Sequence, residues 1–198
     1  MSETRQMYIG GAWAAAASGA SFTDYNPATG QAWARVADAS RADALRAIEA
    51  ARDAFPAWSR LAPSLRAGYL LKVADALERR QEELTNVRVE EGGAWVGFAK
   101  FETDYTPGIY RSAAALCYQP LGEVMPSNYG KLSLVVREPL GVVTAISPWN
   151  APLLLSSRGI AVALAMGNTV VLKPSEETPV AGGVMLAQAL EEARLPPG

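Results

Sequence analysis

The fold is decided by residues 141–176, which read GVVTAISPWNAPLLLSSRGIAVALAMGNTVVLKPSE. The β-branched run from Gly141 to Ile146 predicts a strand, and residues 153–166 predict a helix that Gly167-Asn168 ends. Residues 169–172 predict a second, short buried strand. Because strand, helix and strand in this order are typical of a parallel sheet, we expect an α/β fold in the C-terminal third.

A second helix follows this unit. Thr178-Pro179 forms an N-cap and first-turn pair, and Pro196-Pro197 closes the pattern. In β-α-β-α units, ligands bind beyond the carboxyl ends of the strands. Residues 148–150 and 173–176 each follow a predicted strand, so we expect them to lie along one rim of the sheet.

Two residues of this rim have complementary polar groups. Lys173 is a charged donor, and Glu176, three residues further on, can accept hydrogen bonds from a diol such as a ribose. Spacing alone favours the simpler interpretation that both are solvated loop residues.

Asn150 follows a Pro-Trp pair at a strand end, where its amide could donate to a developing oxyanion. Spacing favours the alternative that Asn150 caps the helix beginning near Pro152. Trp149 could lie beside a ligand, although filling the layer between helix and sheet is commoner for such a residue.

Upstream, residues 1–38 are expected to be extended chain and turns. Ser40 is a candidate N-cap for an amphipathic helix that carries Leu45, Ile48 and Phe55 on one face and runs to Pro56. One further helix is predicted from Pro63 to Gly92-Gly93, with an apolar face formed by Leu70, Val73, Leu77, Leu84 and Val87. Another is predicted over residues 100–117, kinked or interrupted at Pro107-Gly108, and residues 132–136 predict a strand.

Composition excludes several classes of protein. The 198 residues include 18 Lys and Arg, 20 Asp and Glu and no His, so there is no basic excess for nucleic acid and no imidazole for a metal site or a Ser-His-Asp triad. The first six residues are polar and lead into no apolar segment, which predicts no secretory signal and a cytoplasmic protein. The most apolar stretch, residues 151–172, is too interrupted to span a membrane.

Other candidate groups have simpler explanations. Cys117, the single cysteine, lies in an apolar helical context, which favours a buried structural thiol over a nucleophile. Glu90-Glu91 and Glu191-Glu192 lie near helix ends, where a solvated surface accounts for them. The glycine fingerprint GxGxxG and the GxxxxGK loop are both absent, so a nucleotide would need another mode of binding.

Several ordered motifs nevertheless resemble the NAD(P)-dependent aldehyde dehydrogenase superfamily. They are Ile9-Gly10-Gly11-Ala12-Trp13, Asn26-Pro27-Ala28-Thr29-Gly30, the helix end at residues 50–58, Arg137-Glu138-Pro139-Leu140-Gly141-Val142-Val143, Ser147-Pro148-Trp149-Asn150, residues 167–176 and Leu195-Pro196-Pro197-Gly198. This resemblance covers the whole chain. It implies a Rossmann-type cofactor domain that binds its cofactor without the glycine fingerprint and is incomplete here, with a truncated parallel sheet and no catalytic domain.

The resemblance also implies roles for individual residues. Ile146, Ser147, Pro148 and Trp149 match the family's cofactor-lining strand end, and Lys173 and Glu176 match its site for the adenosine ribose. Ser175, between these two, is a further expected cofactor-binding residue. A carboxylate at Glu176 would accept from a free 2′-hydroxyl and repel a 2′-phosphate, so NAD is expected rather than NADP. Asn150 matches the amide that stabilises the oxyanion. Residues 1–120 would form the N-terminal part of the cofactor domain, 121–140 an oligomerisation β segment and 141–198 the first β-α-β-α unit.

By this resemblance the protein is expected to oxidise an aldehyde to a carboxylic acid with NAD, and residues 150–153 with Arg158 look more like the aromatic-aldehyde branch than the betaine aldehyde branch. The family's nucleophilic cysteine and general-base glutamate would follow Gly198, so the 198 residues alone are not expected to turn over substrate. Two alternatives are a non-catalytic nucleotide-binding or assembly module, and a fragment that needs a complementary chain. A homo-oligomer is the expected assembly of the family.

Overall fold

The computed structural model describes residues 4–120 and 122–198. Residues 1–3, which belong to the stretch considered above for a signal, and Leu121, with which the predicted oligomerisation segment begins, lie outside the described residues. Among the helices of the described part, none is long and apolar enough to cross a membrane.

The N-terminal segment forms two antiparallel hairpins, which confirms the expected extended chain and turns. Their strands are β1 (Met7–Ile9) with β2 (Ala12–Ala14), and β3 (Ser21–Tyr25) with β4 (Ala32–Ala37). The turn between β3 and β4 is built by Asn26, whose side-chain oxygen accepts the backbone N–H groups of Ala28 at 2.9 Å and Thr29 at 3.2 Å. Gly30 closes this turn with φ of 68°, a left-handed conformation that favours glycine.

Helix α1 (Arg41–Ser59) begins where the sequence predicts. Ser40 is its N-cap and forms a capping box with Asp43, in which each side chain bonds the backbone N–H of the other residue. The predicted end is wrong, because Pro56 lies inside the helix, which continues to Ser59. The last turn is fixed by Trp58, whose indole N–H donates to the Leu164 carbonyl at 3.1 Å.

The predicted apolar face of α1 is also wrong. Leu45 is 43% exposed and Ile48 is 39% exposed, whereas Ala51 and Trp58 are the buried apolar residues. The helix contacts strands β7 and β8, and the Thr169 hydroxyl of β8 donates to the Ala51 carbonyl at 2.8 Å. The face of α1 that packs on the strands is therefore not the one that carries Leu45 and Ile48.

Two helices replace the single one predicted from Pro63 onward. They are α2 (Pro63–Arg79) and α3 (Gln81–Gly92), which meet at Arg80. The predicted buried face is confirmed at four of its positions, Leu70, Val73, Leu77 and Leu84, each at most 1% exposed. Gly93 ends α3 in the left-handed conformation, as the Gly92-Gly93 pair predicts.

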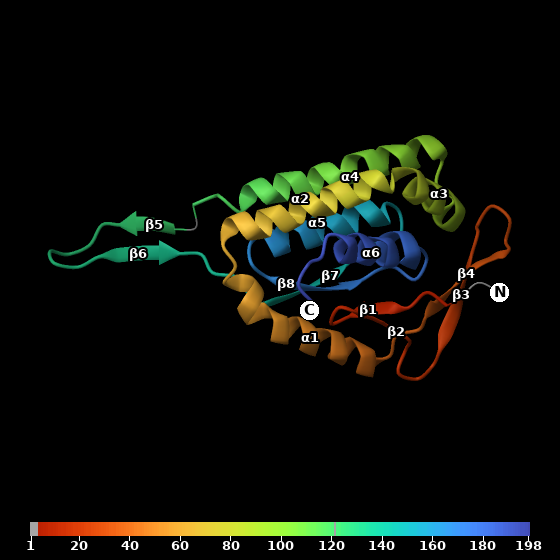
Figure 1. Cartoon of the computed structure of the whole chain (residues 1–198), viewed down its shortest axis with the longest axis horizontal. Coiled ribbons are helices and arrows are strands. Elements are labelled where there is room, and N and C mark those ends of the chain that lie inside the picture. Colours follow the sequence, from red (N-terminus) through yellow and green to blue (C-terminus); the bar gives the residue numbers. More distant parts are fainter. Residues whose placement is uncertain (1–3, 121) are drawn as a thin grey trace.

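Helix α4 (Val96–Leu116) runs through Pro107, so of the two expected possibilities, a kink or an interruption, the interruption does not occur. Proline supplies no N–H to the helix. The hydroxyl of Thr106 donates to the Glu102 carbonyl at 2.7 Å and supports this turn from the side chain. Since α4 lies along α2, tertiary packing holds the helix continuous where local preference disfavours it (Figure 1).

A hairpin of β5 (Gly122–Met125) and β6 (Ser133–Val136) extends from the body of the molecule (Figure 1). Every residue of both strands is exposed. The sequence predicted a strand over residues 132–136, which β6 confirms, and the family resemblance alone implied a β segment over residues 121–140.

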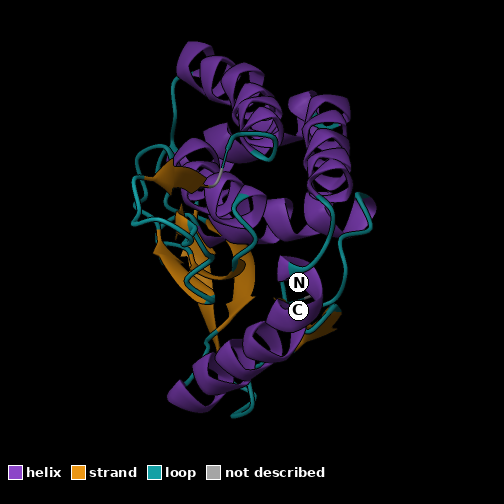
Figure 2. Cartoon of the chain, turned by 90° about the vertical axis from the view of Figure 1, so that its left-hand side faces the viewer, coloured by secondary structure: helices purple, strands orange, loops and turns teal. Residues whose placement is uncertain are grey.

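The C-terminal unit has the predicted order. Strand β7 (Val142–Ile146), helix α5 (Pro152–Ala165) and strand β8 (Thr169–Lys173) form a parallel pair with a helical crossover. A π-helical turn, η1 (Val180–Val184), then leads into α6 (Met185–Glu192). Both α1 and α5 contact β7 and β8, and α2 and α4 lie over α5, so Figure 2 shows the larger helical layer on one side of the strands and α1 on the other.

One contiguous core joins these layers. Its residues from α2, α4, α5 and α6 that are at most 1% exposed are Leu70, Val73, Ala74, Ala76, Leu77, Ala113, Tyr110, Leu153, Ala161, Ala165, Leu186 and Ala189. Half of this set is alanine, which lets the helix backbones approach one another closely.

Candidate functional site

The carboxyl ends of β7 and β8 lie side by side, as the sequence predicts. The parallel register pairs Ile146 with Lys173 at the last position of both strands. Beyond that pair, the Ser147 N–H donates to the Lys173 carbonyl at 3.2 Å, and the Thr178 hydroxyl donates to the Trp149 carbonyl at 3.4 Å. The loops after the two strands therefore form one rim, which brings the predicted site residues together.

Lys173 and Glu176 face each other on this rim. Lys173 Nζ lies 2.9 Å from Glu176 Oε2, and the two side chains are 59% and 71% exposed. The pKa of the Glu176 carboxyl is lowered, first by a hydrogen bond from its own backbone N–H and next by Lys173. At neutral pH the rim therefore presents an ionised acceptor beside a cationic donor, a pair suited to a ribose diol.

Ser175 lies between them in sequence but is buried. Its hydroxyl oxygen accepts the Glu177 N–H at 3.3 Å, so this side chain shapes the turn after β8. Ser147 is buried as well, and its hydroxyl bonds that of Ser156 at 2.7 Å, which ties the end of β7 to helix α5.

Apolar surface is exposed next to these polar groups. Ile146 is 76% exposed and Trp149 is 60% exposed, and Pro148 is exposed too. The commoner interpretation of Trp149, that it fills the helix–sheet layer, is therefore wrong for the described chain. Exposed ring and aliphatic surface at a strand end offers a flat contact to a ligand.

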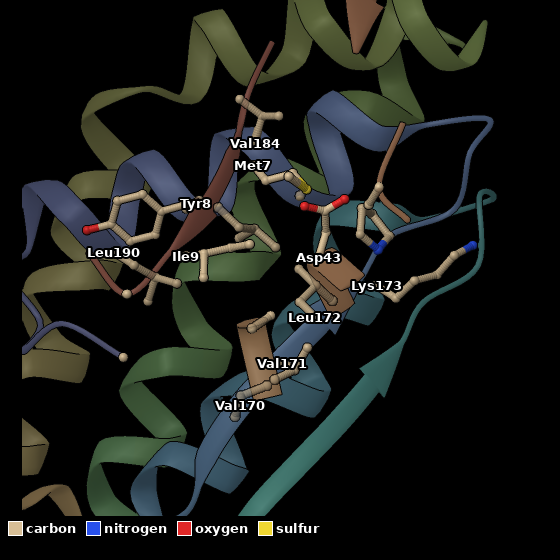
Figure 3. A pocket seen from close by; sticks show the side chains of 18 of the residues that line it. Met7, Tyr8, Ile9, Asp43, Val170, Val171, Leu172, Lys173, Val184 and Leu190 are labelled. Carbon is tan, nitrogen blue, oxygen red and sulfur yellow. The ribbon is translucent and has the colours of Figure 1, made fainter. Parts of the chain in front are cut away.

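A cavity of about 590 Å³ adjoins the rim. Its walls come from β1, α1, β8 and α6, and Figure 3 shows Val170, Val171 and Leu172 along one wall with Lys173 at its end. The lining continues through Pro174, Ser175 and Glu176. The cavity is thus mainly apolar along β8 and becomes polar where that strand ends.

Asn150 is exposed and does not cap α5. The N-cap is Ala151, and in the described structure no side chain of the cap residue bonds the helix. The favoured alternative for Asn150 is therefore wrong, and its amide is left available to a ligand. Its backbone carbonyl accepts a hydrogen bond from Arg88 Nη2 at 3.2 Å.

Arg88 and Glu102 were missed by sequence reasoning. Arg88 Nε lies 2.6 Å from Glu102 Oε2, and both side chains are at most 2% exposed. No local signal identifies them, since they come from separate helices and meet the Asn150 loop only in the folded chain.

The interpretation of Glu90-Glu91 as solvated is wrong for Glu91, which is 2% exposed, although Glu90, Glu191 and Glu192 are exposed. The Glu91 carboxylate accepts the N–H groups of Val180 at 2.6 Å and Ala181 at 2.8 Å. Burial raises the pKa of Glu91 to about 8. Burial also raises the pKa of Asp24, to about 6, and the negative charge of Asp24 raises the pKa of Glu91 further.

Cys117 is 3% exposed, and its thiol lies 3.6 Å from the Ala165 carbonyl. Burial raises the pKa of this thiol, which disfavours the thiolate. The structural role expected for Cys117 is confirmed.

Comparison with known proteins gives a consistent result. The model of the aldehyde dehydrogenase family matches residues 13–198. A vanillin dehydrogenase from Pseudomonas sp. (strain HR199 / DSM 7063) is 44% identical over 195 residues, which cover 97% of this chain and 40% of that protein. A salicylaldehyde dehydrogenase from Pseudomonas putida is 36% identical, again over 98% of this chain and 40% of the relative.

Solved structures agree with the sequence matches. The salicylaldehyde dehydrogenase of Pseudomonas putida G7, complexed with salicylaldehyde, superposes with a TM-score of 0.94 at 34% identity, over 98% of this chain and 40% of its own. A benzaldehyde dehydrogenase from Corynebacterium glutamicum, described as NAD-dependent, gives 0.93 at 38% identity, over 97% and 42% of the two chains. The chain thus spans about 40% of the length of the curated relatives it matches.

Proposed function

The chain belongs to the aldehyde dehydrogenase family, and from this premise we propose that it forms the cofactor-side part of an enzyme that oxidises an aromatic aldehyde to the carboxylic acid. The observation that carries the proposal is the shared rim of β7 and β8. Asn150 lies in the loop after β7, Lys173 is the last residue of β8, and Glu176 lies in the loop that follows. The names of the relatives, vanillin and salicylaldehyde dehydrogenases, support the aromatic substrate class.

A nicotinamide cofactor is the redox partner that the family uses, and it would accept hydride from the aldehyde carbon. The residues present fit such a ligand. Lys173 and Glu176 offer an exposed donor and acceptor for the adenosine ribose, and Ile146, Pro148 and Trp149 offer exposed apolar surface beside them. Ser147 and Ser175 hold the two loops from within.

We propose that NAD is preferred to NADP. Glu176 is ionised at neutral pH, as a glutamate normally is, and its own backbone N–H and Lys173 lower its pKa further. A carboxylate at the ribose accepts from the free 2′-hydroxyl and repels a 2′-phosphate.

The role proposed for Asn150 is to donate its amide N–H to the carbonyl oxygen as that oxygen gains negative charge. Asn150 suits this role because its side chain is exposed at a strand end and is not used to cap α5. Cys117, the single thiol of the sequence, is buried away from solvent, so the attacking nucleophile is proposed to come from sequence outside these 198 residues.

The exposed β5–β6 hairpin supports a further part of the proposal, that residues 121–140 join subunits or a complementary chain. Its strands present unpaired edges, which are sites for pairing with another chain. Residues 1–120 and 141–198 would then form the body of the cofactor domain.

The first test is the intact mass of the polypeptide made from the native gene in its own cell, followed by aldehyde oxidation assays on that polypeptide with NAD and with NADP. We expect a mass well above 21.0 kDa and turnover of benzaldehyde-type substrates with NAD. Asn150→Ala should lower kcat about 100-fold, as removal of one oxyanion donor does. A polypeptide of higher mass that oxidises no aldehyde, or an Asn150→Ala variant with unchanged kcat, would refute the proposal.

The cofactor preference has its own matched pair of variants. Glu176→Gln should shift the ratio of NADP to NAD affinity about tenfold toward NADP, because one negative charge beside the phosphate is removed. Glu177→Gln, at the next exposed position, should leave the ratio unchanged. An equal shift in both variants would assign the preference to net charge and not to Glu176.

A further inference from the structure

A buried ion pair lies beneath the loop that carries Asn150. Arg88 comes from α3 and Glu102 from α4, and their side chains are 2% and 0% exposed. Among the described residues, Nη1 of Arg88 has no hydrogen-bond acceptor, so the guanidinium is held by only two of its nitrogens. Taking two charges out of water is costly, and such a pair is weak evidence for stability by itself.

Both members of the pair also bond the loop after β7. Arg88 Nη2 donates to the Asn150 carbonyl at 3.2 Å, and Glu102 Oε1 accepts the Leu154 N–H at 3.1 Å. Leu154 lies in the first turn of α5, whose N–H groups have no partner within the helix. The cap residue Ala151 supplies no side-chain bond to α5. The carboxylate of Glu102, which belongs to α4, takes the place of that cap and complements the dipole of α5.

These two bonds fix the segment from Asn150 to Leu154 at both of its ends. The charges that make them are themselves locked together at 2.6 Å, so neither can move without the other. Gly92 leaves room for this arrangement, because a Cβ built at that position would collide with Arg88 Nη1. The backbone of Asn150 is therefore set by a rigid buried unit, while its side chain stays exposed.

We propose that Arg88 and Glu102 are positioning residues for the Asn150 amide. The inference rests on the proposed function, in which that amide donates to the developing oxyanion. Donors for an oxyanion work because they are oriented before the reaction, and a displacement of about 1 Å can cost on the order of 100-fold in rate. The Asn150 side chain is exposed, so buried contacts of its own do not hold this residue in place. The ion pair holds it instead, through the backbone carbonyl.

The test uses the polypeptide produced from the native gene and the double variant Arg88→Met, Glu102→Gln. This variant leaves no unpaired buried charge, retains a side-chain oxygen for the Leu154 N–H and removes the donor to Asn150. We expect kcat to fall about tenfold with KM for NAD changed by less than about twofold. Exchange of the Leu155 amide, which bonds the Ala151 carbonyl next to Asn150, should become faster. The control is Arg111→Met with Glu78→Gln, an exposed ion pair between α4 and α2, which should leave kcat and exchange unchanged.

Repeating the test in the Asn150→Ala variant distinguishes a positioning role of the ion pair from a general role in stability. If Arg88 and Glu102 act through Asn150, their replacement should cause no further loss of kcat in the Asn150→Ala variant. An equal loss in both backgrounds, or an unchanged kcat with Asn150 present, would overturn the inference and leave the proposed function standing. An Asn150→Ala variant with unchanged kcat would instead refute the proposed function, and with it the catalytic meaning of the pair.

A milder variant covers the case in which the double variant does not fold. Arg88→Lys keeps a charge opposite Glu102 but replaces the two separate nitrogens, Nε for Glu102 and Nη2 for Asn150, by a single one on a shorter, non-planar group. It should lower kcat in the same Asn150-dependent way. Full kcat in this folded variant would overturn the inference.

Discussion

Burial of Glu91 makes the stability of the chain depend on pH in a direction unusual for a carboxyl group. Its pKa is raised from 4.5 to about 8 in the folded chain, with desolvation as the largest cause. A raised pKa means that the folded state holds a proton which the unfolded chain has already released. The stabilisation is complete below the unfolded pKa of 4.5 and is lost as the pH rises through about 8.

The magnitude follows from proton linkage. Where the folded state holds one proton more than the unfolded chain, the free energy of unfolding falls by about 1.4 kcal/mol for each unit by which the pH rises. Between about pH 6 and about pH 7.5 we therefore expect a loss of about 2 kcal/mol from Glu91. Carboxyls whose pKa is lowered, such as Glu78, are ionised in both states throughout this window and contribute no slope.

The assay is urea unfolding of the 198-residue chain at both pH values, followed by the fluorescence of its tryptophans, of which Trp58 is buried. Glu91→Gln should remove most of the slope, and the small remainder comes from Asp24, whose raised pKa of about 6 lies at the lower end of this window. The substitution should also lower stability by about 1–3 kcal/mol, because one of the two N–H groups of Val180 and Ala181 loses its acceptor. Glu90→Gln is the matched control, since that exposed neighbour bonds Asn26 and should keep the slope.

Two outcomes would refute this reasoning. One is a wild-type stability that rises between the two pH values, and the other is a Glu91→Gln variant that retains the wild-type slope. The same measurement on Asp24→Asn separates the contributions of the two carboxyls whose pKa values are raised. With its negative neighbour removed, Glu91 should titrate at a lower pH, so the loss of stability should begin earlier.

Two further predictions concern the body of the fold. Leu70→Ala should lower the free energy of unfolding by about 2–5 kcal/mol, because Leu70 is 0% exposed in the core. Leu71→Ala, at an exposed position, should cost far less, and equal losses for the two variants in urea unfolding would contradict this prediction. Ser40→Ala should cost about 1 kcal/mol by removing the N-cap of α1, and Ser40→Asp should restore most of that loss, which thermal unfolding followed by circular dichroism would measure.

The C-terminal unit could be predicted from sequence because its determinants are local. Strands β7 and β8 are short β-branched runs, and Gly167, with φ of 83°, ends the helix between them. The rim followed from topology alone, since parallel strands end on the same edge of a sheet. Lys173 and Glu176 could be named as candidates because both follow a strand within four residues of sequence.

Elements whose environment depends on distant residues were predicted less well. Periodicity in α1 identified a helix and its cap but assigned burial to Leu45 and Ile48, which are exposed. A hydrophobic pattern states which face is apolar, not which face another element covers. In the same way, Pro107 disfavours a helix locally, but α4 is held along α2 and remains continuous.

Buried charges were the least predictable part of the site. Glu91 lies beside Glu90 in sequence, and the two differ only in which side of α3 they occupy. Their partners lie far along the chain, Asn26 for Glu90 and the turn at Val180 for Glu91, so spacing could not distinguish them. The same holds for Arg88, whose bond to Asn150 spans 62 residues.

The end of α3 nevertheless explains why the rim has a fixed geometry. Arg88 bonds the loop after β7 through Asn150, and Glu91, one helical turn later, bonds the start of η1 after β8. One turn of one helix thus holds both loops that carry the proposed site, although neither residue reaches the rim surface. The two strands fix only where the loops begin, so the course of the loops depends on this turn together with the hydrogen bonds of Ser147, Ser175 and Thr178. A change at the end of α3 should therefore disturb the Asn150 loop and the turn at Val180 together.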